Sequence, residues 1–204
     1  MPSATTIRKT AEYMITRALI FLIETAAGLY TLLLLLRFYL QWARAPQRNP
    51  LSDFINALTN FAVRPARRVI PGLWGMDVAS LLLAWLVQFV DVFLVLQLRG
   101  YEFGAAPGQA ILAMMLIAAV MLVRLGLYIV IVVLIAQAVL SWVNPYSPIA
   151  PLLNALSRPF LRPFQRLIPP VANVDLSPLF VIITCQLLLM LPVAYLEGAL
   201  TRLL

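Results

Sequence analysis

The chain has 204 residues, of which 63% are hydrophobic and only 11% charged, and its mean hydropathy is +0.94. Soluble domains average about 45–50% apolar and about 25% charged residues. This composition therefore excludes an ordinary soluble domain and predicts an integral membrane protein whose extra apolar surface faces lipid. The formal net charge is +7. In a membrane protein an excess of basic residues first indicates topology and contact with anionic lipid headgroups. We expect no direct nucleic-acid binding.

The residue types that most enzymes and metal sites use are scarce. The chain has no histidine, which removes the commonest general base and metal ligand. Its one cysteine, Cys185, cannot form an intramolecular disulfide or a zinc site. It lies in an apolar run that is typical of a small buried side chain. We therefore expect a protein that is not an enzyme and that holds no cofactor and no metal.

The apolar stretches come in chain order after a basic N-terminal segment, residues 1–17. No small-residue cleavage site follows the first apolar run, so that run is predicted to be a retained span. Stretches that satisfy the need for about 20 apolar residues per crossing cover about residues 18–43, 78–98, 111–143 and 176–196. As one helix the third stretch would extend about 50 Å, against a hydrocarbon core of about 30 Å.

The second half of the chain repeats the first. A shift of 98 residues superposes Gly28-Leu29-Tyr30 on Gly126-Leu127-Tyr128, Pro50 on Pro148, Arg64-Pro65 on Arg162-Pro163, Ile70-Pro71 on Ile168-Pro169, Asp77 on Asp175, and Gln88 on Gln186. Trp42 and Trp142 also correspond after compensating two-residue shifts. So many matches of rare residues in one register indicate a tandem duplication.

Each repeat therefore reads span, connecting segment, span, with the first repeat at residues 18–100 and the second at 111–198. The third stretch becomes one long helix whose start lies at the membrane interface, as the counterpart of about residues 14–43. Because each repeat has an even number of spans, both repeats point the same way. The predicted fold is all-α, with four transmembrane helices in two tandem parallel repeats, each built as span, amphipathic helix, span.

Each connecting segment contains a predicted amphipathic helix. In the second repeat Ser147 is the expected N-cap and Pro148 the first helical residue. Apolar residues recur at helical spacing in both segments: Leu51, Phe54, Ile55, Leu58 and Phe61 in the first, and Ile149, Leu152, Leu153, Leu156 and Phe160 in the second. Arg-Pro steps are expected to end both helices. Such a helix lies in the headgroup plane or caps its own bundle, and the two placements are compatible.

The connectors are also strongly basic. Against one acid, Asp53, they hold Arg44, Arg48, Arg64, Arg67, Arg68, Arg158, Arg162 and Arg166. The positive-inside rule places both connectors in the cytoplasm, whereas the basic N-terminus argues for the opposite orientation. The candidate residues for contact with anionic lipid or a partner protein are Arg64, Arg67, Arg68, Arg158, Arg162 and Arg166.

Polar residues inside the predicted spans usually face the bundle interior or extend toward an interface. Arg37 is only about 9 Å of helix from the connector, so we expect it to reach that interface. Gln88 and Gln186 occupy equivalent positions at the middle of their spans. We expect them to form hydrogen bonds across the bundle rather than to line a pore.

The acidic residues are assigned structural roles. Glu24 and Arg124 lie at equal depth on parallel helices, so they either pair between the repeats or reach the outer interface separately. Asp91 has no partner that is evident from the sequence. Asp77 and Asp175 each precede a span, which is typical of a helix cap rather than of a catalytic pair, and each is placed to pair with the arginines before it.

The second connecting segment carries a dense motif, namely Ser141-Trp142, Asn144-Pro145, Leu161-Arg162-Pro163, Arg166, Ile168-Pro169-Pro170 and Asp175-Leu176-Ser177-Pro178. With this motif the chain resembles the YggT family, also called YlmG, of small bacterial and plastid membrane proteins. The resemblance covers about residues 18–198. The motif residues given a structural role are Trp142, Asn144, Pro145, Pro163, Pro169, Asp175, Ser177 and Pro178.

The two repeats depart from the family pattern in different places. In the first repeat Gly72 replaces the second proline, and residues 76–80 lack the Ser-Pro step. In the second repeat Ala172 and Asn173 stand where the family has glycines. If the motif has a shared binding role, the second repeat is the better candidate.

The resemblance implies a non-enzymatic membrane factor, because the family is linked to cell division and shape, nucleoid or plastid organisation, osmotic tolerance and cytochrome assembly. Two-repeat chains look typical of proteobacterial inner membranes. We therefore expect a multi-pass structural or assembly factor that contacts anionic lipid and a membrane or cytoplasmic protein partner, and an oligomer is compatible with this. The alternative is a channel or transport accessory in osmotic or ion homeostasis.

Overall fold

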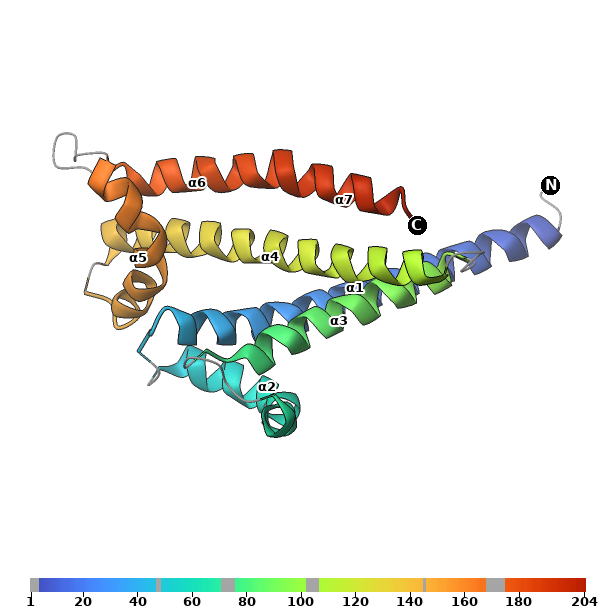
Figure 1. The fold of residues 1–204 in the computed structure, drawn as a ribbon, viewed down its shortest axis with the longest axis horizontal. Coiled ribbons are helices and arrows are strands. Elements are labelled where there is room, and N and C mark those ends of the chain that lie inside the picture. Colours follow the sequence, from blue (N-terminus) through green and yellow to red (C-terminus); the bar gives the residue numbers. More distant parts are fainter. Residues whose placement is uncertain (1–3, 47–48, 71–75, 102–106, 145, 168–174) are drawn as a thin grey trace.

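The computed structural model describes residues 4–46, 49–70, 76–101, 107–144, 146–167 and 175–204. The helices in these ranges are α1 (Ala4–Trp42), α2 (Pro50–Val69), α3 (Val78–Leu98), α4 (Pro107–Val143), α5 (Ala150–Leu167), α6 (Ser177–Leu188) and α7 (Ala194–Thr201). A π-helical turn, Leu189–Val193, joins α6 to α7, so that the three form one continuous rod (Figure 1).

Four helical segments are long and apolar enough to cross a membrane: Glu12–Trp42, Val78–Leu98, Pro107–Ser141 and Ser177–Thr201. The long third stretch is a single helix, α4, as the repeat predicts. Helix α1 starts at Ala4, so the described part of the basic N-terminal segment is helical and continuous with the first span.

The repeats are parallel. Helices α1 and α4 run in the same direction, and the connectors α2 and α5 lie at the same end of the bundle, opposite the C-terminus and the start of α1 (Figure 1). The predicted class, an all-α chain of two tandem parallel repeats with four membrane-length helices, is confirmed.

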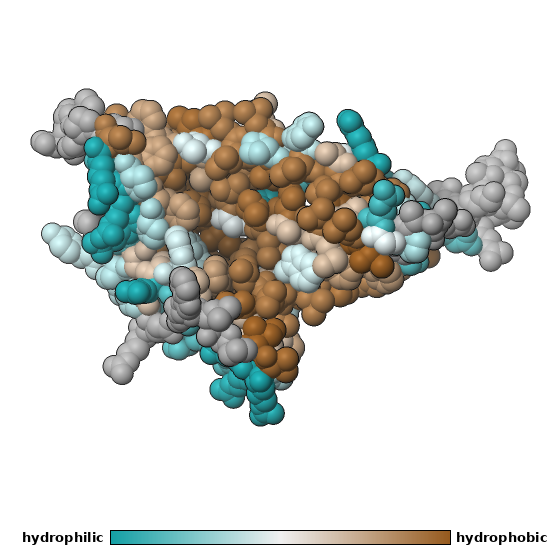
Figure 2. Space-filling model, in the orientation of Figure 1, coloured by the Kyte–Doolittle hydropathy of each residue, from teal (hydrophilic) through white to brown (hydrophobic). Residues whose placement is uncertain are grey.

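Helices α1, α3 and α4 pack against one another, and the fourth span lies at the edge of this group, beside α4. Helix α3 packs against α1 and α4, and α4 packs against α6 and α7. One apolar core links both repeats, with Leu34, Ile55, Ala84, Ile129 and Leu156 contributed by α1 to α5 in turn. A second cluster joins α4, α5 and α6 and includes Cys185, which is buried as expected. Figure 2 shows apolar side chains over the middle of the visible face and hydrophilic ones gathered toward the ends.

The fourth span is interrupted by a proline. Pro192 has no backbone N–H to donate, and its ring would collide with the carbonyl one turn earlier in a regular α-helix. The chain widens to a π-helical turn at this point, which accommodates the ring without ending the helix. The span therefore continues from Ser177 to Thr201.

The Arg-Pro steps do not end the connector helices, so that prediction is wrong. Pro65 lies inside α2, and Pro159 and Pro163 lie inside α5. A proline removes only its own intrahelical hydrogen bond, and a partly exposed helix can hydrate the carbonyl that is left free. Helix α2 ends later, at Val69, and its C-cap Ile70 is extended and precedes Pro71 in the sequence.

The two connectors turn overlapping but different faces to the bundle: Thr59 and Val63 of α2 and their equivalents Ser157 and Leu161 of α5 are all buried, but the residues around them differ. In α2 four members of the predicted apolar stripe, Leu51, Phe54, Leu58 and Phe61, are exposed, whereas the fifth, Ile55, is buried together with Ser52, Thr59 and Val63. In α5 the stripe is turned inward, with Leu152, Leu156 and Leu161 buried. Helix α5 therefore caps its bundle, while α2 packs by a mixed polar face and leaves most of its apolar stripe outward.

Candidate functional site

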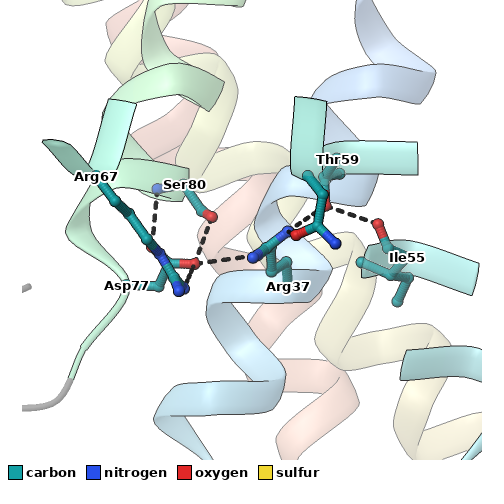
Figure 3. Close-up of polar contacts among 7 residues, drawn as sticks. Arg37, Ile55, Thr59, Arg67, Asp77 and Ser80 are labelled. Carbon is teal, nitrogen blue, oxygen red and sulfur yellow. Dashed lines mark hydrogen bonds and ion pairs between the residues drawn. The ribbon is translucent and has the colours of Figure 1, made fainter. Parts of the chain in front are cut away.

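The main polar cluster of the described residues lies where α1, α2 and α3 meet. Helix α1 contributes Arg37 from an otherwise apolar run, and α2 contributes Thr59, Asn60 and Arg67. Asp77 is the N-cap of α3, where a carboxylate satisfies backbone N–H groups that have no helical partner. Figure 3 shows Arg37, Thr59, Arg67 and Asp77 converging from the three helices.

Asp77 is the acceptor at the centre of the cluster. Arg67 donates to it through two nitrogens, Nε to Oδ1 at 3.1 Å and Nη2 to Oδ2 at 2.6 Å. Arg37 donates from Nε to Oδ2 at 3.2 Å. Ser80 donates its hydroxyl to Oδ2 at 2.6 Å and its backbone N–H to Oδ1 at 3.4 Å. Burial alone would raise the pKa of Asp77, but the bonds from Arg67 and Ser80 outweigh it and hold the pKa below its ordinary value.

Arg37 is held on its other side by α2. Its Nη1 donates to Thr59 Oγ1 at 2.7 Å and to Asn60 Oδ1 at 2.9 Å, and Thr59 in turn donates to the carbonyl of Ile55 at 2.7 Å. Only 10% of the Arg37 side chain is exposed. Arg37 thus reaches the connector, as expected, but it is not exposed there, because the polar face of α2 covers it and supplies its acceptors.

A pocket of about 420 Å³ opens beside this cluster, between α1 and α2. Its polar lining comes from Arg37 and Gln41 of α1 and from Ser52, Asn56, Asn60, Arg64 and Arg67 of α2. Three guanidinium groups thus border one cavity at the connector end of the bundle. Such a lining offers hydrogen-bond donors and positive charge rather than a nucleophile or a general base.

The second repeat has a smaller version of this arrangement, in which a glutamine replaces the arginine that binds the aspartate. Gln165 donates to Asp175 at 2.8 Å, where the first repeat has Arg67 and Asp77. Gln137 of α4 donates to Asn154 of α5 at 2.8 Å, and both line a pocket of about 140 Å³. Burial would raise the pKa of Asp175, but its bonds with Ser177 and Gln165 hold it below the ordinary value.

Both aspartates act at helix starts, as the sequence indicates. Asp77 caps α3, and Asp175 accepts the backbone N–H of Ser177 at 2.8 Å at the start of α6. The expected pairing with a preceding arginine is confirmed for Asp77, whose partner is Arg67. Asp175 is bonded instead to Gln165, because the second repeat has glutamine at that position.

The other motif residues of the second repeat are spread along its connector. Trp142 lies in the last turn of α4, and Asn144 directly follows it. Pro163 is inside α5, Ser177 is buried, and Pro178 is in the first turn of α6. Pro145 and Pro169 lie outside the described residues.

The candidate lipid-contacting arginines are exposed, as that role requires. Arg64, Arg67 and Arg68 lie on the last turns of α2, and Arg158, Arg162 and Arg166 lie on α5. The three arginines of α2 differ in their contacts: Arg67 is bound to Asp77, and Arg64 borders the pocket.

The mid-span glutamines behave differently from each other. Gln88 donates to Thr31 of α1 at 3.2 Å in the buried interior, so the expected bond across the bundle is confirmed there. Gln186 is exposed on α6, and the expectation fails for it. The reason is packing: α3 lies against both α1 and α4, whereas the only other span that α6 packs against within the described residues is α4.

The expected ion pair between Glu24 and Arg124 is not formed, and that prediction is wrong. Glu24 pairs with Arg99 at 3.7 Å, and Arg124 pairs with Glu197 of α7 at 3.1 Å. Equal depth brings two side chains together only if their helices face each other at that depth, and here each charge has a nearer partner within its own repeat. Asp91 is buried, and its Oδ1 has no hydrogen-bond partner among the described residues.

The sequence does not identify Arg37, Thr59 and Asn60 as members of one cluster, but α2 carries a signal that could have done so. Ser52, Asn56, Thr59 and Asn60 recur at helical spacing on the side opposite the apolar stripe. Within the same described ranges, no group of three His, Cys, Asp or Glu side chains is placed to hold a metal ion.

The fold and the site together define a two-repeat helical protein of membrane type, with basic amphipathic connectors gathered at one end. The chain belongs to the CCB3/YggT family, whose model matches twice, at residues 16–98 and 114–196. The uncharacterised protein PA0392 of Pseudomonas aeruginosa is 40% identical over 85% of this chain and 87% of its own length. The uncharacterised protein YggT of Escherichia coli K12 is 35% identical over 81% of this chain and 84% of its own. No solved structure matches the chain.

Proposed function

We propose that the protein is a non-enzymatic structural or assembly factor of the bacterial cytoplasmic membrane, with consequences for envelope organisation or division. The observation that carries the proposal is the gathering of both connectors, with their exposed arginines, at one end of the bundle. Anionic headgroups attract basic residues by about 1 kcal/mol each. A surface of this kind suits anionic lipid together with a membrane or cytoplasmic protein partner.

The exposed apolar stripe of α2 supports the same proposal. Phe61 is 73% exposed, and Phe54 and Leu58 lie beside it on the stripe. Apolar side chains next to basic residues are typical of a helix that lies in the headgroup layer. The connectors would then fix the bundle at the membrane surface and present it to a partner there.

The experiment is complementation of a deletion strain, with cell shape and division-site placement as the readout. The quadruple variant Arg68→Gln, Arg158→Gln, Arg162→Gln, Arg166→Gln removes exposed connector charges without touching Asp77. We expect it to reach the membrane at normal abundance but to fail to restore shape. The control, Arg202→Gln at the other end of the bundle, should complement fully. Full complementation by the quadruple variant would contradict the proposal.

A channel or transport accessory is the second candidate, and Asp91 is the observation that favours it. A buried carboxyl with an oxygen left without a described partner, in the middle of a membrane-length helix, is a common feature of ion and proton pathways. Proteoliposomes containing the full chain separate the two functions. A structural factor should pass no more ions than empty vesicles, whereas an Asp91→Asn-sensitive flux would support the second candidate.

A further inference from the structure

The pocket between α1 and α2 is rich in hydrogen-bond donors, although Leu40 and Ile55 also line it. Arg37, Arg64 and Arg67 supply guanidinium groups, and Asn56 and Asn60 supply amides. No acidic side chain of the described ranges lines it. Its volume of about 420 Å³ falls within the range of about 300–1,000 Å³ that is usual for small-ligand sites.

Several of these donors are unused. Arg37 donates from Nε and Nη1, while its Nη2 has no partner among the described residues. Arg64 and Asn56 border the same cavity and form no hydrogen bond within that part of the chain. A guanidinium group can donate five N–H bonds, so the pocket has spare donors that point to an acceptor with several oxygens.

The charge of the pocket is also unbalanced. Asp77 is the one carboxylate bound to both Arg37 and Arg67, so a single negative charge faces two positive ones. Arg64 adds a third positive charge, and both Arg64 and Arg67 repel the charge of Arg37. An anion in the pocket would relieve this repulsion.

We propose that this pocket binds a phosphate group, carried by a lipid headgroup or by a free phosphate. Guanidinium groups bind phosphate through paired, charge-assisted hydrogen bonds, and they do so better than a point charge such as lysine. Arg37 and Arg67 line the pocket already oriented by Asp77, and Arg64 and Asn56 line it with donors that are not yet bonded.

The proposal deepens the proposed function, and its lipid form rests on the placement of the connectors in the headgroup layer. The second repeat provides an internal comparison. There the corresponding pocket is about 140 Å³ and is lined by Gln137, Ser141 and Asn154, with no arginine. Phosphate binding is therefore expected in the first repeat alone.

The test uses the full chain, purified and delipidated in a maltoside detergent. Arg64→Gln is the informative variant, because Arg64 borders the pocket but does not hold Asp77. Arg162→Gln is the matched control, since Arg162 occupies the equivalent position of the second repeat and carries the same charge. One arm titrates inorganic phosphate against chloride at equal ionic strength and follows thermal stability. The other counts retained lipid by native mass spectrometry, with phosphatidylglycerol against diacylglycerol, which has no phosphate.

We expect saturable binding of one phosphate group per chain, weakened about tenfold by Arg64→Gln and unchanged by Arg162→Gln. Arg64-dependent binding in the lipid arm alone identifies a headgroup, and binding of inorganic phosphate identifies the phosphate group itself as sufficient. Absence of saturable binding in both arms would overturn the proposal. So would equal effects, or no effect, of the two substitutions. The arginines that are changed in the complementation test do not line this pocket. If the phosphate proposal fails, the proposed function therefore still stands.

Discussion

At the scale of single residues, Asp77 is the side chain that connects three helices. It caps α3, binds Arg67 of α2 and binds Arg37 of α1. A buried ion pair adds little to stability compared with apolar packing, but losing one partner is costly because the other charge stays buried. Asp77 thus fixes the relative positions of three helices, and Arg37 depends on it.

The first prediction compares the two equivalent aspartates. Asp77→Asn should lower the free energy of unfolding by about 3–5 kcal/mol, because Arg37 then remains buried without a negative partner. Asp175→Asn is the matched control and should cost about 1 kcal/mol or less, since Asp175 is exposed and bonded to a neutral glutamine. Denaturation of the purified protein in detergent measures both.

The pH dependence gives an independent check of that comparison. The folded pKa of Asp77 lies below its ordinary value of 3.8. Its contribution to stability is therefore complete above that value and is lost as the pH falls through the lower, folded pKa. The wild type should lose stability on acidification in this range, and Asp77→Asn should lose less. Parallel pH profiles for the two proteins would contradict the assignment.

The second prediction contrasts two buried polar residues of α3. Asp91 has an oxygen without a described partner, whereas Gln88 is bonded to Thr31. Asp91→Leu should raise the melting temperature, because it removes a buried polar group that lacks full hydrogen bonding. Gln88→Leu should lower the stability by about 1–3 kcal/mol, because Thr31 loses this partner. Shifts in the same direction would show that Asp91 is satisfied in the membrane.

The sequence allowed the role of Asp77 as a cap and as a partner of the preceding arginines to be predicted, because both follow from short-range order along the chain. The partners of Arg37, Glu24 and Arg124 could not be predicted. Counting along a helix gives the depth of a residue, but which residues meet also depends on how each helix is rotated and which helix is its neighbour. Those are properties of the packed bundle.

At the scale of the elements, α2 and α5 show how buried charge decides which face of a helix turns inward. Helix α2 turns Thr59 and Asn60 toward Arg37, which needs acceptors, and most of its apolar stripe faces outward as a result. Helix α5 packs on Gln137 of α4 and not on an arginine. It needs no charged-group acceptors on that face, and it buries Leu152 and Leu156 instead.

The third prediction tests this difference with nitroxide labels in proteoliposomes, on a Cys185→Ser background. A label at Phe54→Cys should be accessible to oxygen, which dissolves in lipid, and protected from a water-soluble nickel chelate. Leu152→Cys, the equivalent position of α5, should resist labelling because its side chain is only 3% exposed. High nickel accessibility at Phe54 would mean that the stripe faces water.

The existence and order of the helices could be predicted from apolar length and from the repeat, and α4 as one long helix is the clearest case. The residues at which the connector helices end could not be predicted. An Arg-Pro step lowers the stability of a helix, but Pro65 and Pro163 show that a surface helix can pass through such a step. Helix α2 stops at Val69, and its C-cap Ile70, which directly precedes the next proline in the sequence, is extended.

At the scale of the whole molecule, the parallel repeats place both connectors on one side. The fourth prediction is that Asp53→Cys and Arg158→Cys react with an impermeant thiol reagent from the same side of the membrane, and Gln109→Cys from the other. Because the connectors carry the excess of arginine, we expect the first two to react from the cytoplasmic side. Reaction of Asp53→Cys and Arg158→Cys from opposite sides would contradict the parallel arrangement.

The direction of the two repeats has a consequence for how such a chain can change over generations. Each repeat begins and ends at the same end of the bundle, so copying or deleting one leaves the orientation of everything behind it unaltered. Duplication of a repeat therefore keeps the topology, whereas inserting an odd number of spans would invert every span that follows. The two copies can diverge independently, and in this chain one holds a charged pocket while the other holds a neutral one. A single gene thus carries two variants of the same module, held side by side in one membrane.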